Sequence, residues 1–169
     1  MLPKNSQLNT IIKVPSWSRI SIVATLCLST WASLATAQSN ASFVEKNVTE
    51  HQALSRGLAQ NMWDWAETRF HEQKSSQAMQ QILAEQGFKI EAGIAGMPTA
   101  FVATYGSDDG PVIGILAEMD ALPGLSQQAV PHKQAIDGKA AGHACGHHLF
   151  GAGSLSAALT VKNWLQQNK

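Results

Sequence analysis

The six residues 112–117, with the sequence VIGILA, constrain the fold more than any other segment of this chain. Apolar residues at successive positions give an extended segment two apolar faces. Such a strand is typical of the centre of a sheet that is covered on both sides. Two carboxylates, Glu118 and Asp120, follow it closely. We therefore expect a central strand with acidic side chains at its carboxyl end.

Helical spacing of apolar residues predicts three helices around this segment. A capping box formed by Thr49 and Gln52 predicts the start of the first helix, which continues to about Glu67. The second helix is expected from residue 75 or 76 to residue 86, where a glycine follows. A last helix is expected to begin near Leu149.

Strand patterns lie between the second and the last helix. Residues 88–92 and 99–105 are predicted strands, and the glycine-bounded turn at 106–110 predicts an antiparallel hairpin between 99–105 and 111–117. A long loop at about 120–143 follows, and loops of that length are usually functional or disordered. Helices that alternate with strands predict an α/β fold.

The first 37 residues have the pattern of a cleaved export signal. Residues 1–19 contain basic residues and no acid, residues 20–34 are an apolar run, and Ala35-Thr36-Ala37 provides the small residues that signal peptidase reads. A membrane anchor is the alternative, but an apolar run of about 15 residues is short for a span that needs about 20. We expect cleavage after residue 37, export to the periplasm or secretion, and no stable membrane span afterwards.

Removal of this signal changes the length, the net charge and the cysteine content of the chain. Residues 38–47 are interpreted as a polar linker and 48–169 as one domain, because 132 of the 169 residues remain. Three of 12 basic residues and none of 12 acids leave, so the net charge becomes −3. This balance argues against a nucleic-acid partner. Cys27 also leaves, which makes Cys145 the single remaining cysteine and excludes an intrachain disulfide.

Metal-ligand residue types concentrate just before the last helix. The sequence GHACGHH, at residues 142–148, contains Cys145 and His147, which can both face one metal ion from a glycine-containing loop. Glu118 and Asp120 are expected at the carboxyl end of a strand, where α/β proteins tend to place their sites. The pattern therefore predicts a metal site at this edge of the sheet.

Other roles for these residues stay open. Cys145 is alternatively a nucleophile paired with a neighbouring histidine, a ligand of a structural zinc site, or an inert buried thiol. His132 and His148 are interpreted as solvent-facing or as groups that support the ligands. Trp63 and Trp65 are expected in the core, with a ligand platform as the alternative.

Four segments together resemble the aminoacylase and carboxypeptidase family of dinuclear metallopeptidases, peptidase family M-twenty. They are WDWAE at 63–67, GIAGMPTAFVATYG at 93–106, ILAEMDALPGLS at 115–126 and the stretch from 142 to 155. The resemblance covers residues 48–162. It implies a three-layer αβα catalytic domain with a mixed sheet, of which this chain is the amino-terminal part, truncated before the lid and dimerisation domain.

The resemblance also implies roles for individual residues. Cys145 and His147 would bind a pair of divalent metal ions. Asp120 would orient a metal ligand without binding the metal itself. Glu118 and His143 are further candidate ligands. A thiolate ligand favours Zn²⁺, with Mn²⁺ as the alternative. His148 stands where relatives commonly have Asn or Asp.

The implied reaction is metal-dependent hydrolysis of amide bonds in small N-acyl amino acids or dipeptide-like substrates, of which aminobenzoyl-glutamate is the nearest named example. The family uses a Glu as general base, and no Asp or Glu follows His148 in this chain. We expect the general base to be absent and this chain alone to be inactive. Family members oligomerise through the domain that is missing here. The alternative is a non-catalytic remnant that binds a metal or a partner.

Overall fold

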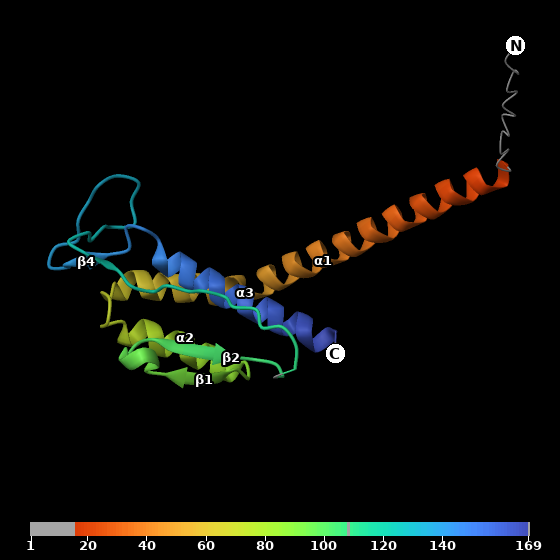
Figure 1. Cartoon of the computed structure of the whole chain (residues 1–169). Helices are drawn as coiled ribbons and strands as arrows, with labels where there is room; N and C mark the ends of the chain where they lie inside the picture. The colour runs from red at the N-terminus through yellow and green to blue at the C-terminus, as the bar shows by residue number, and fades with distance from the viewer. Residues whose placement is uncertain (1–15, 108, 169) are drawn as a thin grey trace, which may run out of the picture. The chain divides into compact units, whose positions relative to one another are not determined.

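The computed structural model describes the backbone of residues 16–107 and 109–168, with side chains described from residue 40 onward in those ranges. In chain order the elements are α1 (Ser16–Trp65), α2 (Gln73–Glu85), β1 (Lys89–Ala92), the 3-10 helix η1 (Ile94–Gly96), β2 (Phe101–Thr104), β3 (Leu122–Pro123), β4 (Ala141–Gly142) and α3 (His147–Gln167) (Figure 1). Two compact units are distinguished, Met1–Phe43 and Val44–Lys169, and the site lies in the second.

Helix α1 begins earlier than its capping box predicts. Residues 38–47, the expected linker, are helical, and Thr49 Oγ1 donates a hydrogen bond to Glu45 O at 2.8 Å. A threonine inside a helix can bond to the carbonyl one turn earlier in this way. The capping-box prediction is therefore wrong, whereas the predicted end near Glu67 is confirmed.

The predicted export signal falls partly outside the described residues, because residues 1–15 are not among them. The remainder of that signal belongs to α1. Within the described helices, none is both long enough and apolar enough to cross a membrane. The boundaries at residues 37 and 47 stay predictions.

The core of the second unit is formed by three helices that each bury one apolar face. Helix α2 and helix α3 confirm the two later helix predictions, with α3 starting two residues before Leu149. The buried residues at helical spacing are Leu58, Ala59, Met62, Met79, Leu83, Ala152, Leu155 and Leu159. Burial of each large apolar side chain stabilises the fold by about 1.5–3 kcal/mol. The helices therefore supply the rigid frame on which the loops are held.

Strands β1 and β2 pair with each other and cover this core. The pairing is antiparallel, with Lys89 opposite Thr104 and Ala92 opposite Phe101. Phe88, Ile90 and Phe101 pack against the helical core. Both strand predictions are thus confirmed, but the partner of residues 99–105 is β1 and the predicted hairpin with 111–117 is wrong.

Residues 111–117 do not pair with the β1–β2 sheet and instead run along α3 (Figure 1). Ser154 Oγ donates to Leu116 O at 2.6 Å. Gly151 allows the close approach, because a Cβ at this position would lie 2.6 Å from Glu118 O. Hydrogen bonding and packing against α3 therefore replace the expected strand pairing, and the expected position at the centre of a sheet is not observed among the described residues.

The α/β class is confirmed, with two small antiparallel sheets in the described residues. The second sheet pairs β3 with β4 and lies inside the predicted loop at about 120–143. A parallel bridge between Thr68 and Ala121, with Ala121 N donating to Glu67 O at 2.7 Å, ties the start of this loop to the end of α1. These contacts hold the loop at the helix ends where the candidate site lies.

Candidate functional site

His147 lies between two carboxylates. Its Nε2 is 2.7 Å from Glu118 Oε2, and its Nδ1 is 2.8 Å from Asp120 Oδ1. The same Nδ1 is 3.1 Å from the carbonyl oxygen of Asp120. Both ring nitrogens of the imidazole are thus directed at acidic residues, and the structure brings Glu118, Asp120 and His147 together.

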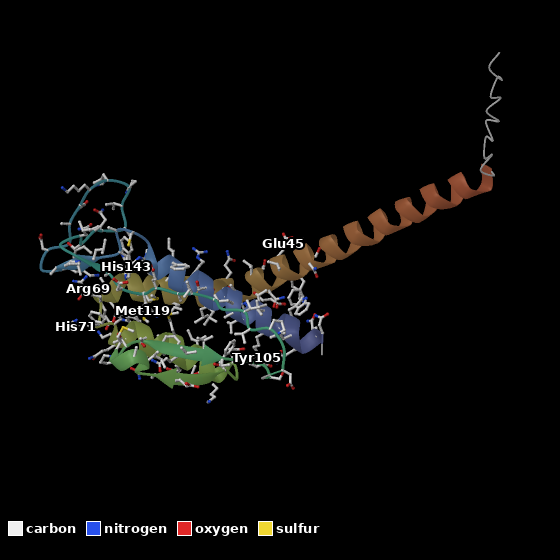
Figure 2. The ribbon with its side chains drawn as sticks, in the orientation of Figure 1. Glu45, Arg69, His71, Tyr105, Met119 and His143 are labelled. Atoms are coloured by element: carbon white, nitrogen blue, oxygen red, sulfur yellow. The ribbon has the colours of Figure 1, made fainter. Side chains whose placement is uncertain are left out.

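Two local features of the backbone bring these three side chains together. His147 is the first residue of α3 and follows Gly146, whose φ of 87° turns the chain into the helix. Side chains two positions apart point to the same side of an extended chain, and Glu118 and Asp120 are two positions apart. Figure 2 shows Met119, which lies between them in sequence, at the same end of the compact unit as Arg69 and His143.

The cluster has part of the geometry of a metal site. A carboxylate on one ring nitrogen commonly orients a histidine whose other nitrogen binds a metal ion. Asp120 occupies that supporting position on Nδ1. However, Glu118 already contacts Nε2, and the described residues contain no group of three or more His, Cys, Asp or Glu placed to hold a metal ion. The residues present therefore fit a partial ligand set and not a complete metal centre.

Cys145 is not brought into this cluster. Its thiol is free and exposed, so the inert buried thiol is wrong as an interpretation. No hydrogen bond joins its sulfur to a histidine within the described ranges, and a preformed nucleophile–base pair is therefore not observed. Gly146, in the left-handed conformation with φ at 87°, lies between Cys145 and His147.

His143 and His148 are buried, and their rings contact each other. His143 Nε2 donates to Met62 O at 3.0 Å, and its ring centroid lies 4.7 Å from that of His148. Trp63 packs against His148, with ring centroids 5.1 Å apart. His143 thus faces the backbone of α1 instead of the carboxylates, and the solvent-facing interpretation of His148 is wrong.

Burial lowers the pKa of both of these histidines. For His143, desolvation has the largest effect, and the nearby His148 lowers the pKa of His143 further. For His148, desolvation is the cause of the lower pKa. Their Nδ1 atoms have no hydrogen-bond partner among the described residues. Burial therefore favours the neutral form of both rings. In contrast, His132 is exposed, with Nε2 at 3.0 Å from Gln134 Oε1.

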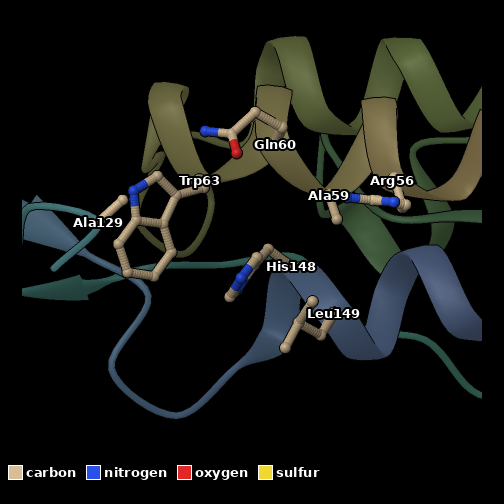
Figure 3. A pocket seen from close by; sticks show the side chains of 7 residues that line it. All are labelled: Arg56, Ala59, Gln60, Trp63, Ala129, His148 and Leu149. Carbon is tan, nitrogen blue, oxygen red and sulfur yellow. The ribbon is translucent and has the colours of Figure 1, made fainter. Parts of the chain in front are cut away.

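An open pocket of about 300 Å³ adjoins this histidine pair. Figure 3 shows the indole of Trp63 and the imidazole of His148 along it, between α1 and the start of α3. The lining residues are Arg56, Ala59, Gln60, Trp63, Ala129, His148 and Leu149. Trp65 instead packs against the helical core. The expected core position is thus confirmed for Trp65, whereas Trp63 lines a pocket.

Sequence reasoning missed two residues that hold the frame of the site. The carboxylate of Glu67 accepts hydrogen bonds from Lys74 N at 3.0 Å, from Ser75 N at 2.9 Å and from Ser75 Oγ at 2.8 Å. Lys139 Nζ donates to Trp63 O and to Asp64 O at the end of α1. Both contacts join residues whose separation in sequence does not match the repeat of a helix or a strand. No periodic pattern in the sequence therefore predicts them.

Comparison with known proteins yields several relatives of this chain, while no family model matches it. It is 36% identical over 126 residues to a subunit of p-aminobenzoyl-glutamate hydrolase from Escherichia coli, across 74% of this chain and 26% of the relative. It is 30% identical to N-acetylcysteine deacetylase of Bacillus subtilis, across 62% of this chain and 27% of the relative. It is 32% identical to thermostable carboxypeptidase 1 of Saccharolobus solfataricus, across 63% of this chain and 27% of the relative. The chain therefore spans about a quarter of the length of these relatives.

Proposed function

Because this chain belongs to the family of amidohydrolases and carboxypeptidases that these relatives represent, we propose that it forms part of a metal-dependent amidohydrolase. The bonds hydrolysed would be amides of small N-acyl amino acids or dipeptide-like substrates, of the aminobenzoyl-glutamate type. The single observation that carries the proposal is the position of His147 between Glu118 and Asp120. A histidine oriented by a carboxylate is the usual supporting arrangement of a metal ligand.

Within this proposal each residue has a role that its chemistry supports. His147 and Cys145 are the metal ligands, and Glu118 and His143 are further candidates. Asp120 orients His147 through Nδ1, at 2.8 Å. The thiolate favours Zn²⁺, and Mn²⁺ is the alternative. The ligand set present here is partial, so we assign no step of the reaction to the metal.

The general base has no candidate among the described residues after His148, where the sequence contains no acid. We propose that this chain alone does not turn over substrate and that residues from further polypeptide complete the site. The Escherichia coli relative is named as a subunit, which supports assembly into an oligomer. We also propose that residues 1–37 direct export to the periplasm or to the medium.

Metal binding tests the ligand assignment directly. We expect the purified chain to bind Zn²⁺ in a calorimetric titration, and both Cys145→Ser and His147→Ala to weaken that binding because each removes a ligand. His132→Ala is the matched control, since His132 is an exposed histidine of the same region. Unchanged affinity in both ligand variants would refute the assignment.

Turnover tests the second half of the proposal. The chain is supplied with Zn²⁺ or Mn²⁺, and release of aminobenzoate from aminobenzoyl-glutamate is followed. We expect no turnover above the metal-only control. Turnover that disappears in Cys145→Ala would show that this chain is active by itself. It would contradict the proposal that further polypeptide completes the site.

A second function, a non-catalytic metal-binding or partner-binding protein, is favoured by the partial ligand set in the described residues. Zinc binding without turnover, even after the rest of a relative's catalytic domain is supplied as a separate chain, would support this alternative. Restored turnover would support the amidohydrolase.

A further inference from the structure

The C-terminus of α1 is capped by a side chain from a distant segment. The last carbonyl groups of an α-helix have no donor inside the helix. Lys139 Nζ donates to Trp63 O at 3.2 Å and to Asp64 O at 2.7 Å. Among the described residues no backbone N–H reaches either carbonyl, so Lys139 is the donor that the structure provides for both. The end of α1 is therefore an anchor point for the segment around residue 139.

The charge of this lysine is directed at the helix end. Carbonyl groups at a helix C-terminus have a partial negative charge that favours a cation. The last turn of α1 contains no basic residue. Within the described ranges, Lys139 forms no ion pair with a carboxylate. Lys139 thus supplies, from 75 and 76 positions away, a cation that the last turn of α1 lacks.

A second contact fastens the same segment to α1. His143 Nε2 donates to Met62 O at 3.0 Å, on the carbonyl that precedes Trp63. Lys139 and His143 lie on the two sides of β4 in sequence. Strand β4 is therefore attached to the end of α1 both before it begins and after it ends.

Strand β4 in turn holds the segment that contains Asp120. Strand β3 starts two residues after Asp120 and pairs with β4. The bond from Ala121 N to Glu67 O ties this segment to the residues that follow α1. His147 belongs to α3 and not to the β3–β4 pair. A shift of this pair away from the end of α1 would thus move Asp120 relative to His147.

We propose that Lys139 is a positioning residue of the candidate site. By binding the carbonyl groups at the end of α1, its ammonium group fixes β4 and, through β3, holds the carboxylate of Asp120 at Nδ1 of His147. This role needs no metal ion, because each of these contacts joins two residues of the chain. Only its consequence for zinc binding rests on the function proposed above.

The ring signals of His147 in a nuclear magnetic resonance spectrum test this role without metal. The full chain is studied in a chelating buffer, and the signals are identified by their loss in His147→Gln. Lys139→Met keeps an unbranched side chain but removes the charge and the donors. We expect it to move the signals toward their positions in Asp120→Asn by about half of the difference or more, since the support of the ring is weakened. Lys139→Arg should keep the wild-type positions, because arginine also donates to carbonyl groups.

Two variants control for effects that do not pass through the helix end. Lys162→Met removes a lysine whose described contacts lie outside the site. Ser76→Ala removes a buried hydrogen bond to Thr99 O at 2.6 Å and so lowers stability without removing a contact of β3 or β4. Neither variant should move the His147 signals. Signals that stay in place in Lys139→Met, or that move as far in Ser76→Ala, would overturn the proposal.

Zinc affinity, measured by competition with a chelator, connects this role to the proposed function. We expect Lys139→Met to weaken zinc binding about tenfold, the lower end of the effect of groups that support a ligand, and Lys139→Arg to bind as the wild type does. If His147→Ala weakens binding and Lys139→Met does not, Lys139 does not position a ligand and the proposal is overturned. If His147→Ala leaves binding unchanged, the metal assignment fails instead, and the ring signals alone decide the role of Lys139.

Discussion

The carboxylate of Asp120 lies 2.8 Å from Nδ1 of His147, so the orientation of the imidazole is set from the side opposite Glu118. The contact joins residues 27 positions apart, one following the extended segment and the other starting α3. It is the link between the predicted motif and the proposed chemistry, because a histidine must be oriented before it can act as a ligand.

Asp120→Asn is expected to weaken zinc binding about 10- to 100-fold, because it removes the charge that supports the ligating histidine. Competition with a chromophoric chelator measures the affinity. Asp64→Asn is the control, since the Asp64 carboxylate contacts Gln60 on the exposed side of α1. Equal affinities for the two variants would show that Asp120 does not support a ligand.

Gly151→Ala is expected to lower the free energy of unfolding by about 1–3 kcal/mol, because the new methyl group overlaps the chain at Glu118. The built Cβ lies 2.6 Å from Glu118 O and 3.3 Å from Met62 Cε. Gly153→Ala has open space and is expected to stabilise α3 by about 0.5–1 kcal/mol. Urea unfolding compares the two. The opposite order of stabilities would contradict the close approach of residue 118 to α3.

Glu67→Ala is expected to cost about 1–2 kcal/mol of stability, because three donors at the start of α2 lose their acceptor. Thermal unfolding followed by circular dichroism measures the loss. Glu50→Ala is the matched control, since Glu50 makes an exposed contact with Lys46 at 3.8 Å. A loss no larger than that of the control would mean that Glu67 does not cap α2.

Stability is expected to fall as the pH decreases below about 6.5, the ordinary pKa of histidine. Burial lowers the pKa of His143 in the folded chain, so the unfolded chain binds more protons below that pH and is favoured. The contribution is present in full above pH 6.5 and is lost as the pH falls toward the lowered value. Urea unfolding from pH 7.5 to 5 in a chelating buffer measures the slope.

His143→Gln should reduce this slope, because it removes a group whose pKa is lowered in the folded chain. His148, which is also buried with a lowered pKa, contributes to the slope that remains. An unchanged slope in His143→Gln would contradict the assignment of the acid sensitivity to His143.

Local patterns predicted most of the secondary structure. The apolar spacing of α2 and α3 and the composition of β1 and β2 suffice to place these elements, because each depends on neighbours in sequence. The start of α1 was missed, since Thr49 is compatible both with a helix cap and with a helix interior where it bonds to Glu45.

Strand partners were not predictable in this way. Residues 111–117 have a strong strand pattern. Such a pattern contains no information on which neighbouring strand or helix the segment will contact. Ser154 and Gly151 of α3 provide a hydrogen bond and the space for a close approach, and the chain lies there instead of on β2. The hairpin prediction failed because it used only the turn between two neighbouring segments.

The sequence by itself determined the residue types of the site and the region where they lie, since acids after an extended segment and His147 at a helix start need only local geometry. Tertiary structure alone decided which of them meet. Cys145 is left exposed, whereas Met62 O contacts the buried His143 and Trp63 packs against the buried His148. These outcomes depend on the direction of single side chains against distant elements, which spacing along the chain does not encode.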